Sequence, residues 1–533
     1  MDAQDEGSSL IFIVLGVLLA FYLLLSSERV EPNLKHIRPI GHSSYLLSYI
    51  DALKFLYTGP ALLRGGYEKF QPRIFKISTL NRWLVVITST QHIEELRKAP
   101  EEEVACIVPD DDADALLLSL VGHYDTPLSE DTQTLVRLMT QSLTFMIQDL
   151  REEIVASLSG AIPTPDISTG WSEIDALDFV LHAEVHAVLA RWSYLPSPLG
   201  RATDYKHLCV EVTRLAFERR SHVLPLLVPG FFKRVIRFFS KSYRNKKRLR
   251  RIFMTMLKER KALTVGIEPP SPRKVKVQND ILSSILQDSP LDSSIFNSLF
   301  ELSLNANESL SLTFLHVLYH LAANPKYASP MRKEIESIAS REGWTKASLE
   351  KMRKVDGFVK ESMRVSGVSC VTMIRKTLQP FMFSDGTTLP TGTVLCVASD
   401  ARHLDPHLSS SSSSSSSPEV FDGFRHSRLY EHHYGDSSPS FTTPTSGASW
   451  GTGGTGGSTR FQLTTATPDY LAWGYGRHAC PGRFFAAVVL KMLLAHVVLG
   501  YDVRFEDGMR PEDVVDGARR VPNPRARVLF RKR

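Results

Sequence analysis

The sequence predicts a mainly α-helical protein with small β-sheets, preceded by one membrane-spanning helix. Long apolar stretches at 312–323 and 483–499 have the length and composition of buried helices, whereas short β-branched and aromatic runs lie nearer the N-terminus. A third observation is the unbroken apolar run from Leu10 to Leu25. With 533 residues, 43% of them hydrophobic, the chain is able to bury a large core. Length alone would also allow three small domains.

The apolar run at the N-terminus predicts a membrane anchor. As a helix it would cross about 24 Å at about 1.5 Å per residue, close to the roughly 27 Å of an endoplasmic-reticulum bilayer. A cleavable signal peptide would begin with basic residues, but this run is preceded by acidic ones and followed by basic ones. These are Asp2, Asp5 and Glu6 before it, and Arg29, Lys35 and Arg38 after it. We therefore expect a single-pass anchor at 1–30 in the endoplasmic reticulum membrane, with the main domain, 31–533, in the cytosol.

The elements of the domain follow from local patterns. Residues 74–77 and 83–87 are short runs rich in β-branched and aromatic residues, and they predict two strands of a small sheet. The apolar stretch 312–323 predicts a long helix, which Asn324-Pro325 would end. From Arg483 to about Leu499 the chain is apolar on nearly every side, which predicts a core helix rather than a surface helix.

Composition excludes some classes of function. The net charge of +6 is modest and gives no reason to expect nucleic acid as a partner. The cysteines show neither zinc nor disulfide spacing, so the body of the protein should face a reducing compartment. A serine run at 409–417 and a glycine-, serine- and threonine-rich stretch at about 435–460 cannot bury enough apolar surface to fold. We expect them to be disordered surface insertions or the trace of a retained intron.

One cysteine stands on a glycine-rich loop directly before the C-terminal apolar helix. The loop reads Trp473-Gly474-Tyr475-Gly476-Arg477-His478-Ala479-Cys480-Pro481-Gly482. Backbone N–H groups in a tight turn, together with a helix N-terminus, stabilise a thiolate at such a position. The glycines permit the unusual dihedrals of the turn, and Pro481 suits the first helical position. The alternative is an inert buried cysteine beside a turn.

The spacing within this loop resembles the haem-binding loop of the cytochrome P450 superfamily. An aromatic residue lies seven before Cys480, a glycine four before, a basic residue two before and a glycine two after. The resemblance implies the cytochrome P450 fold, haem b (iron protoporphyrin IX) as cofactor, and Cys480 as axial ligand of the iron. It also places Gly476 and Trp473 in the cofactor-binding loop. Trp473 stands where the family has phenylalanine, and its N–H would alter the hydrogen bonding of the thiolate.

A charged network is expected beneath the loop. Glu361-Ser362-Met363-Arg364 looks like the family's Glu-x-x-Arg helix, in which the i,i+3 spacing puts both charges on one face. The stretch 421–426 lies where the family places a second arginine, here Arg425. The resemblance implies that Glu361, Arg364 and Arg425 form a buried structural lock.

Residues 305–309 resemble the family's central helix. In that comparison Ala306 is the small residue that makes room for oxygen, Glu308 is the acid and Ser309 the alcohol of a proton relay. Ser309 replaces the usual threonine. The alternative is that Glu308 and Ser309 are ordinary polar residues on a helix face.

Basic side chains are expected to pair with the haem propionates, as cations hydrogen-bonded to carboxylates. His478 stands where many family members have arginine, and Arg375 stands on the strand that follows the Glu-x-x-Arg helix. Arg137 would play the same part from an earlier helix, although the family's usual tryptophan-to-arginine pattern is missing there.

The resemblance implies a monooxygenase that activates O2 with electrons from NADPH-cytochrome P450 reductase and oxidises an apolar small molecule. The chain looks most like the fungal ent-kaurene-oxidase-like branch, which suggests a terpenoid in secondary metabolism. Two alternatives remain open: a haem-thiolate isomerase or dehydratase that needs no oxygen or reductase, and a catalytically silent haem-binding membrane protein.

Overall fold

The computed structural model describes residues 33–107, 117–118, 120–121, 130–162, 170–192, 199–218, 241–264, 293–408, 417–434 and 460–533. The expected membrane anchor at 1–30 lies outside the described residues. So do the expected insertions, apart from Ser417 and Arg460 at their edges.

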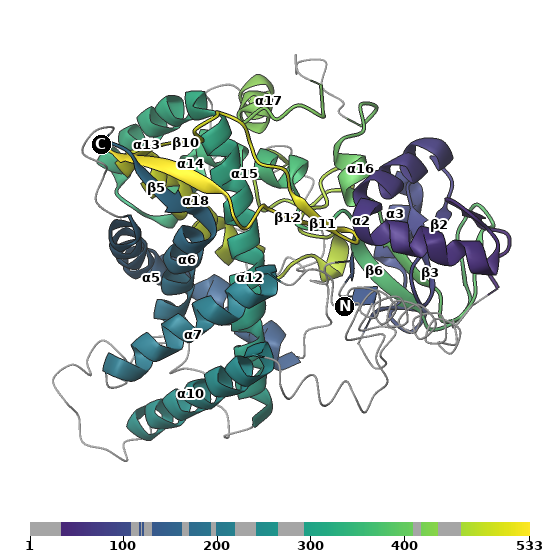
Figure 1. Cartoon of the computed structure of the whole chain (residues 1–533), viewed down its shortest axis with the longest axis horizontal. Helices are drawn as coiled ribbons and strands as arrows, with labels where there is room; N and C mark the ends of the chain where they lie inside the picture. Colours follow the sequence, from purple (N-terminus) through teal and green to yellow (C-terminus); the bar gives the residue numbers. More distant parts are fainter. Residues whose placement is uncertain are drawn as a thin grey trace, which may run out of the picture.

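Helices dominate the structure, as predicted. They pack as one body, while the N-terminal strands gather with α2 and α3 on the opposite side (Figure 1). The longer helices are α2 (Tyr45–Phe70), α3 (Thr90–Lys98), α5 (Glu130–Ala161), α6 (Ala176–Trp192), α7 (Leu199–Glu218), α10 (Lys241–Thr264), α12 (Ser293–Ala323), α13 (Ala328–Glu342), α15 (Arg353–Val365), α17 (Arg425–Tyr434) and α18 (Arg483–Gly500). The shorter ones are α14 (Lys346–Lys351) and α16 (Ser399–His403).

The main sheet has the strand order β1-β2-β3-β9-β6-β4. Its strands are β1 (Arg38–Pro39), β2 (Phe75–Ser78), β3 (Trp83–Ile87), β4 (Val104–Cys106), β6 (Thr372–Thr377) and β9 (Val394–Val397). Both predicted strands are confirmed as an antiparallel pair, with Phe75 opposite Val86. β9 then pairs with β3 in parallel, so a strand from the second half of the chain completes the N-terminal sheet.

The remaining strands form three smaller sheets. The first has the order β10-β13-β5, and the other two are the pairs β11-β12 and β7-β8. Their strands are β5 (Ser172–Asp175), β7 (Phe381–Met382), β8 (Thr388–Leu389), β10 (Tyr501–Arg504), β11 (Val514–Asp516), β12 (Arg519–Val521) and β13 (Arg527–Lys532).

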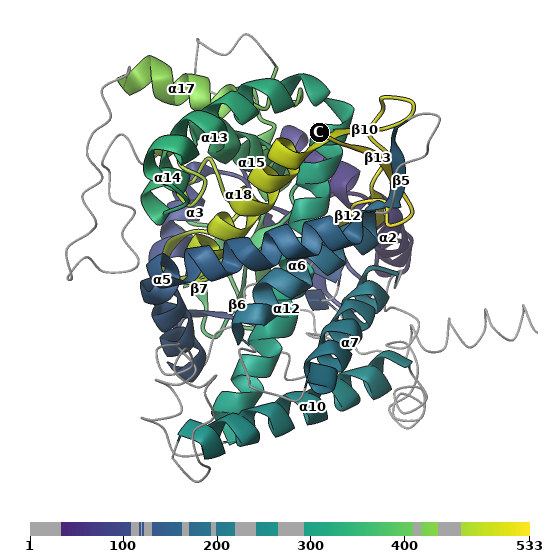
Figure 2. The same ribbon diagram turned by 90° about the vertical axis from the view of Figure 1, so that its left-hand side faces the viewer.

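The central helix α12 runs through the helical body, crossed by α6 (Figure 2). It ends before Asn324 and is followed by a short 3-10 turn at Pro325–Tyr327, which confirms the predicted stop. Phe314 and Leu315 are fully buried on it. A single helix therefore carries the residues of the expected proton relay and a large part of the core.

The C-terminal helix α18 is a core helix, as predicted. Among the described residues it is the one helix long and apolar enough to cross a membrane, but 67% of that window is buried inside the protein. It packs against α5, α13 and α15. Burial on several sides explains why its sequence shows no polar face.

Candidate functional site

The loop that precedes α18 is closed by backbone hydrogen bonding. The N–H of Cys480 donates to the carbonyl of Trp473 at 2.7 Å. Gly474 and Gly476 have φ of 71° and 79°, values that favour glycine. At Gly476 a Cβ would also lie 2.4 Å from Cγ of Arg97, so no larger residue fits there. Gly474 and Gly476 are thus favoured by the backbone path of the loop, whereas Gly482 has an ordinary helical φ of −80° and lacks the unusual dihedral that was expected of it.

Cys480 differs from the other cysteines in its surroundings. It is partly exposed at the start of α18, whereas the other four are buried. Burial raises the pKa of the thiols of Cys209, Cys370 and Cys396 well above the usual range, which makes them poor metal ligands. The guanidinium of Arg483 donates to the Cys480 carbonyl at 2.9 Å and adds positive charge nearby. The inert-cysteine alternative describes those other thiols better than it describes Cys480.

Helix α3 supports the loop from the side of the main sheet. The Tyr475 hydroxyl donates to Oε1 of Glu94 at 2.7 Å, and Arg97 donates to Oε2 of the same carboxylate at 2.8 Å. The Arg97 guanidinium also lies over the Tyr475 ring, 5.4 Å from its centroid. Burial and the hydrogen bond to Glu94 raise the pKa of Tyr475 to about 12, so its hydroxyl stays protonated and keeps donating. Glu94 and Arg97 were not predicted, because an ion pair on a short helix has no recognisable sequence motif.

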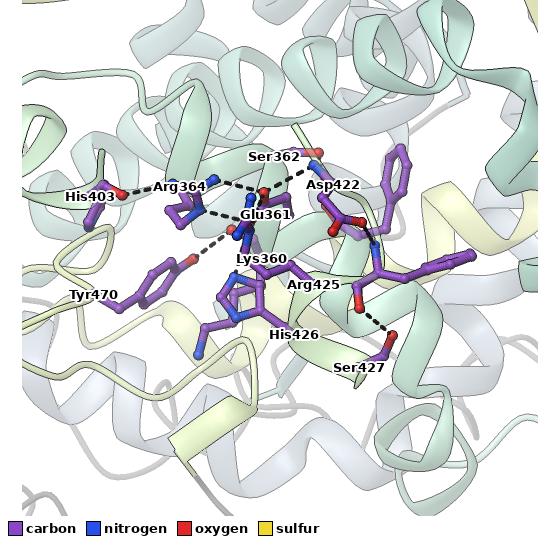
Figure 3. Close-up of polar contacts among 12 residues, drawn as sticks. Lys360, Glu361, Ser362, Arg364, His403, Asp422, Arg425, His426, Ser427 and Tyr470 are labelled. Carbon is purple, nitrogen blue, oxygen red and sulfur yellow. Dashed lines mark hydrogen bonds and ion pairs between the residues drawn. The ribbon is translucent and has the colours of Figure 1, made fainter. Parts of the chain in front are cut away.

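The expected charged network is present beneath the loop (Figure 3). Arg364 donates to both oxygens of Glu361, at 2.7 and 2.8 Å, and Nε of Arg425 donates to Oε1 at 3.0 Å. The Glu361 side chain is fully buried, and His426 lies 3.3 Å from its second oxygen. Burial alone would raise the pKa of Glu361, but Arg364 and His426 outweigh it and hold that pKa well below its usual range. The predicted contact among the three charged residues is therefore confirmed.

His403 joins this network to the cysteine loop. Arg364 donates to the His403 carbonyl at 2.7 Å, and the backbone N–H of Leu471 donates to Nε2 of His403 at 2.8 Å. Burial and the nearby Arg364 lower the pKa of His403 to about 3, so the ring is neutral and able to accept. The network reaches the loop two residues before Trp473. Nothing in the sequence marked His403, because its partner lies in a distant segment.

Glu308 and Ser309, the residues of the expected proton relay on α12, form hydrogen bonds with different neighbours. Glu308 forms a 3.0 Å ion pair with Arg519 of β12. The hydroxyl of Ser309 donates to the carbonyl of Ala306, one turn earlier, at 3.2 Å. All three α12 residues are half-buried. The carboxylate of Glu308 and the hydroxyl of Ser309 therefore have separate hydrogen-bond partners in this structure.

The three basic residues expected at the haem propionates lie in different surroundings. Arg375 is buried on β6, where its guanidinium donates to the carbonyl of Ile374 at 2.8 Å. Nε2 of His478 lies 2.9 Å from a carboxylate oxygen of Glu101. Arg137 is exposed on α5. Of the three, the buried cation of Arg375 best fits a buried carboxylate partner.

Trp473 does not direct its polar atom as expected. Its indole N–H donates to the carbonyl of Leu463 at 2.7 Å, and the side chain is buried. The expectation that this N–H alters hydrogen bonding to the thiolate is therefore wrong for this geometry. The reason is that the backbone carbonyl of Leu463, ten positions earlier, lies within hydrogen-bonding distance of the indole N–H.

Comparisons with known proteins agree with this geometry. A family model described as Cytochrome P450 matches residues 67–428 and 454–530. The chain is 31% identical to cytochrome P450 monooxygenase 151 of Postia placenta over 531 residues, which covers 96% of each protein. It is 26% identical to ent-kaurene oxidase P450-4 of Gibberella fujikuroi, over 98% of this chain and 97% of that protein. A solved structure of retinoic-acid-bound cyanobacterial CYP120A1 superposes with a TM-score of 0.60 at 17% identity, over 91% of this chain and 96% of that one, and shows the same fold.

Proposed function

The chain belongs to the cytochrome P450 family and is a haem-containing monooxygenase, and we propose that it oxidises an apolar terpenoid of secondary metabolism with electrons from NADPH-cytochrome P450 reductase. The observation that carries the haem-thiolate chemistry is the partly exposed Cys480 at the start of α18, on a loop joined through His403 to the buried Glu361 network. The terpenoid class is supported by the likeness to ent-kaurene oxidases over nearly the whole chain.

The residues present fit the cofactor. Cys480 is the thiol that is neither fully buried nor made unreactive by burial, and Arg375 is a buried cation suited to a propionate. Haem held by a cysteine thiolate supplies the oxidising chemistry toward O2 when it is bound. In this proposal Cys480 ligates the iron, while Gly476 and Trp473 shape its loop. His478 and Arg137 are weaker propionate partners, because one faces Glu101 and the other is exposed.

Proton delivery is assigned to α12. Ala306 leaves space beside the helix, and the Ser309 hydroxyl holds the proton that Glu308 resupplies. The 3.0 Å pair with Arg519 keeps the Glu308 carboxylate oriented between turnovers. Release from Arg519 would then free the carboxylate to resupply that proton.

Reconstituted turnover tests the proposed function. Membranes that carry this chain and the reductase, given NADPH, ¹⁸O2 and a panel of apolar terpenoids, should yield a product with one ¹⁸O atom for each oxidation. Glu308→Gln should consume NADPH but lower the product formed per NADPH by about 100-fold or more, because a general acid contributes roughly 10²- to 10⁴-fold. Product formed without NADPH and O2 would instead identify an isomerase or dehydratase.

A membrane-facing surface supports the expected anchor. Leu47, Ile50, Leu53 and Tyr57 are 43%, 47%, 47% and 76% exposed. Their spacing puts them on one face of α2, close to the beginning of the described chain. We assign this stripe to the cytosolic side of the endoplasmic reticulum membrane, beside a single-pass anchor at 1–30.

Carbonate extraction of membranes tests this arrangement. The full chain should stay in the pellet, and removal of residues 1–30 should release most of it. The fraction left on membranes at neutral pH should then fall severalfold on Ile50→Glu, because a charge on the stripe opposes burial in lipid. Phe145→Glu changes a residue that is 81% exposed on α5 and serves as the control. A truncated chain that resists carbonate would contradict the single anchor.

A further inference from the structure

Trp473 is tied to a segment that lies outside its own loop. Its indole N–H donates to the Leu463 carbonyl at 2.7 Å, and its own carbonyl accepts the N–H of Cys480 at 2.7 Å. One residue thus connects Leu463 to the cysteine. Any shift of Trp473 away from Leu463 would also displace the hydrogen bond that orients Cys480.

Leu463 is itself held by a buried ion pair. Its N–H donates to Oδ2 of Asp356 on α15 at 2.8 Å, and the other oxygen of that carboxylate accepts from Lys491 of α18 at 2.8 Å. Lys491 also donates to the Leu349 carbonyl at 2.9 Å. Asp356 and Lys491 are 7% and 5% exposed. A buried ion pair with its remaining hydrogen bonds made is costly to break, so Leu463 is a firm support.

A second contact from α15 holds the same segment. Lys360, one turn after Asp356, donates to the carbonyls of Arg460 and Gln462 at 3.0 and 2.8 Å. Burial lowers the pKa of Lys360 to about 7, and its amine is able to donate in either charge state. The segment 460–463 is therefore clamped to the helix that also carries Glu361 and Arg364.

We propose that Trp473 is a positioning residue that fixes Cys480 as the iron ligand by transmitting the support of Lys491, Asp356 and Leu463 to the cysteine loop. This inference rests on the proposed haem-thiolate function. A phenylalanine at 473 would keep an aromatic ring there but leave the buried Leu463 carbonyl without the indole donor. The tryptophan at this position is thus a support for the loop, and its N–H is not a hydrogen-bond donor to the sulfur.

Ligand loss in the full-length chain tests the proposal. In reduced membranes under carbon monoxide, Trp473→Phe should convert from the red-shifted thiolate band to the unshifted band about tenfold faster than the unchanged chain, because one buried hydrogen bond is lost. Trp344→Phe removes an indole that stacks on His496, away from the loop, and should leave the rate unchanged. Equal rates for Trp473→Phe and the unchanged chain would overturn the proposal, as would equal acceleration by Trp344→Phe.

Two further measurements separate this support from a general loss of packing. Lys491→Met should also speed ligand loss, and combining it with Trp473→Phe should add less than the sum of the separate effects on the logarithm of the rate. Full additivity would overturn the connection through Asp356. The reduction potential should stay the same in Trp473→Phe, since the indole N–H is bonded to Leu463 and not to the sulfur; a changed potential with an unchanged rate of ligand loss would overturn the proposal. If the unchanged chain gives no red-shifted band, the proposed function fails, whatever Trp473 does.

Discussion

Cys480→Ala should abolish the red-shifted Soret band of the reduced, carbon-monoxide-bound protein and reduce turnover to background. Alanine removes the thiolate that the loop presents, and the other four thiols are buried and unable to take its place. The measurement is a carbon monoxide difference spectrum of membranes with equal amounts of protein, judged by immunoblot.

Cys106→Ala is the matched control, because it removes a buried thiol on β4 and leaves the loop untouched. It should retain the red-shifted band. A full red-shifted band in Cys480→Ala would rule out Cys480 as the ligand. An unshifted band in the Cys480→Ala protein would instead show that haem still binds through another group.

Glu361→Gln should destabilise the folded protein by about 3–5 kcal/mol, because it leaves the buried guanidinium groups of Arg364 and Arg425 without their carboxylate. The apparent unfolding temperature and the rate of haem release should both show the loss. Glu342→Gln breaks an exposed pair with Lys351, whose N–O distance is also 2.7 Å, and should change stability by less than about 1 kcal/mol. Equal effects of the two substitutions would show that the Glu361 network does not stabilise the fold.

The same carboxylate predicts a pH dependence. The pKa of Glu361 is held well below its usual range in the folded state, so its stabilisation is fully present above the unfolded value of about 4.3. It is lost progressively as the pH falls from that value toward the folded-state pKa. Between these limits the stability of Glu361→Gln should therefore depend less steeply on pH than that of the unchanged chain.

Local pattern was sufficient for a large part of the fold. The loop from Trp473 to Gly482 is contiguous, so the resemblance of its spacing to the family's haem-binding loop was enough to single out Cys480 as the candidate ligand. The helix α18 and the strand β3 followed from continuous apolar runs within single segments, and both have nearly the predicted bounds. Glu361 and Arg364 were paired correctly because i,i+3 residues share a helical face whatever surrounds the helix.

The supports of the site were not predicted, because they join residues far apart in the chain. The Leu471–His403, Leu463–Asp356 and Lys491–Asp356 bonds span 68, 107 and 135 positions. Two of these bonds use the backbone of a leucine and the third joins two ordinary charged residues, so each depends on a partner that only packing supplies. The indole of Trp473 was misjudged for a different reason, since the carbonyl that accepts its N–H lies only ten positions earlier but outside the motif.

By itself, the sequence determined the fold class and, through the family resemblance, singled out Cys480 and the charged pair Glu361 and Arg364, because those signals lie in short contiguous stretches. Only the tertiary structure decided that Glu308 pairs with Arg519, 211 positions away, and that the indole of Trp473 donates to the Leu463 carbonyl. Hydrogen bonds and ion pairs act over about 3 Å, and only folding brings such distant residues within that reach.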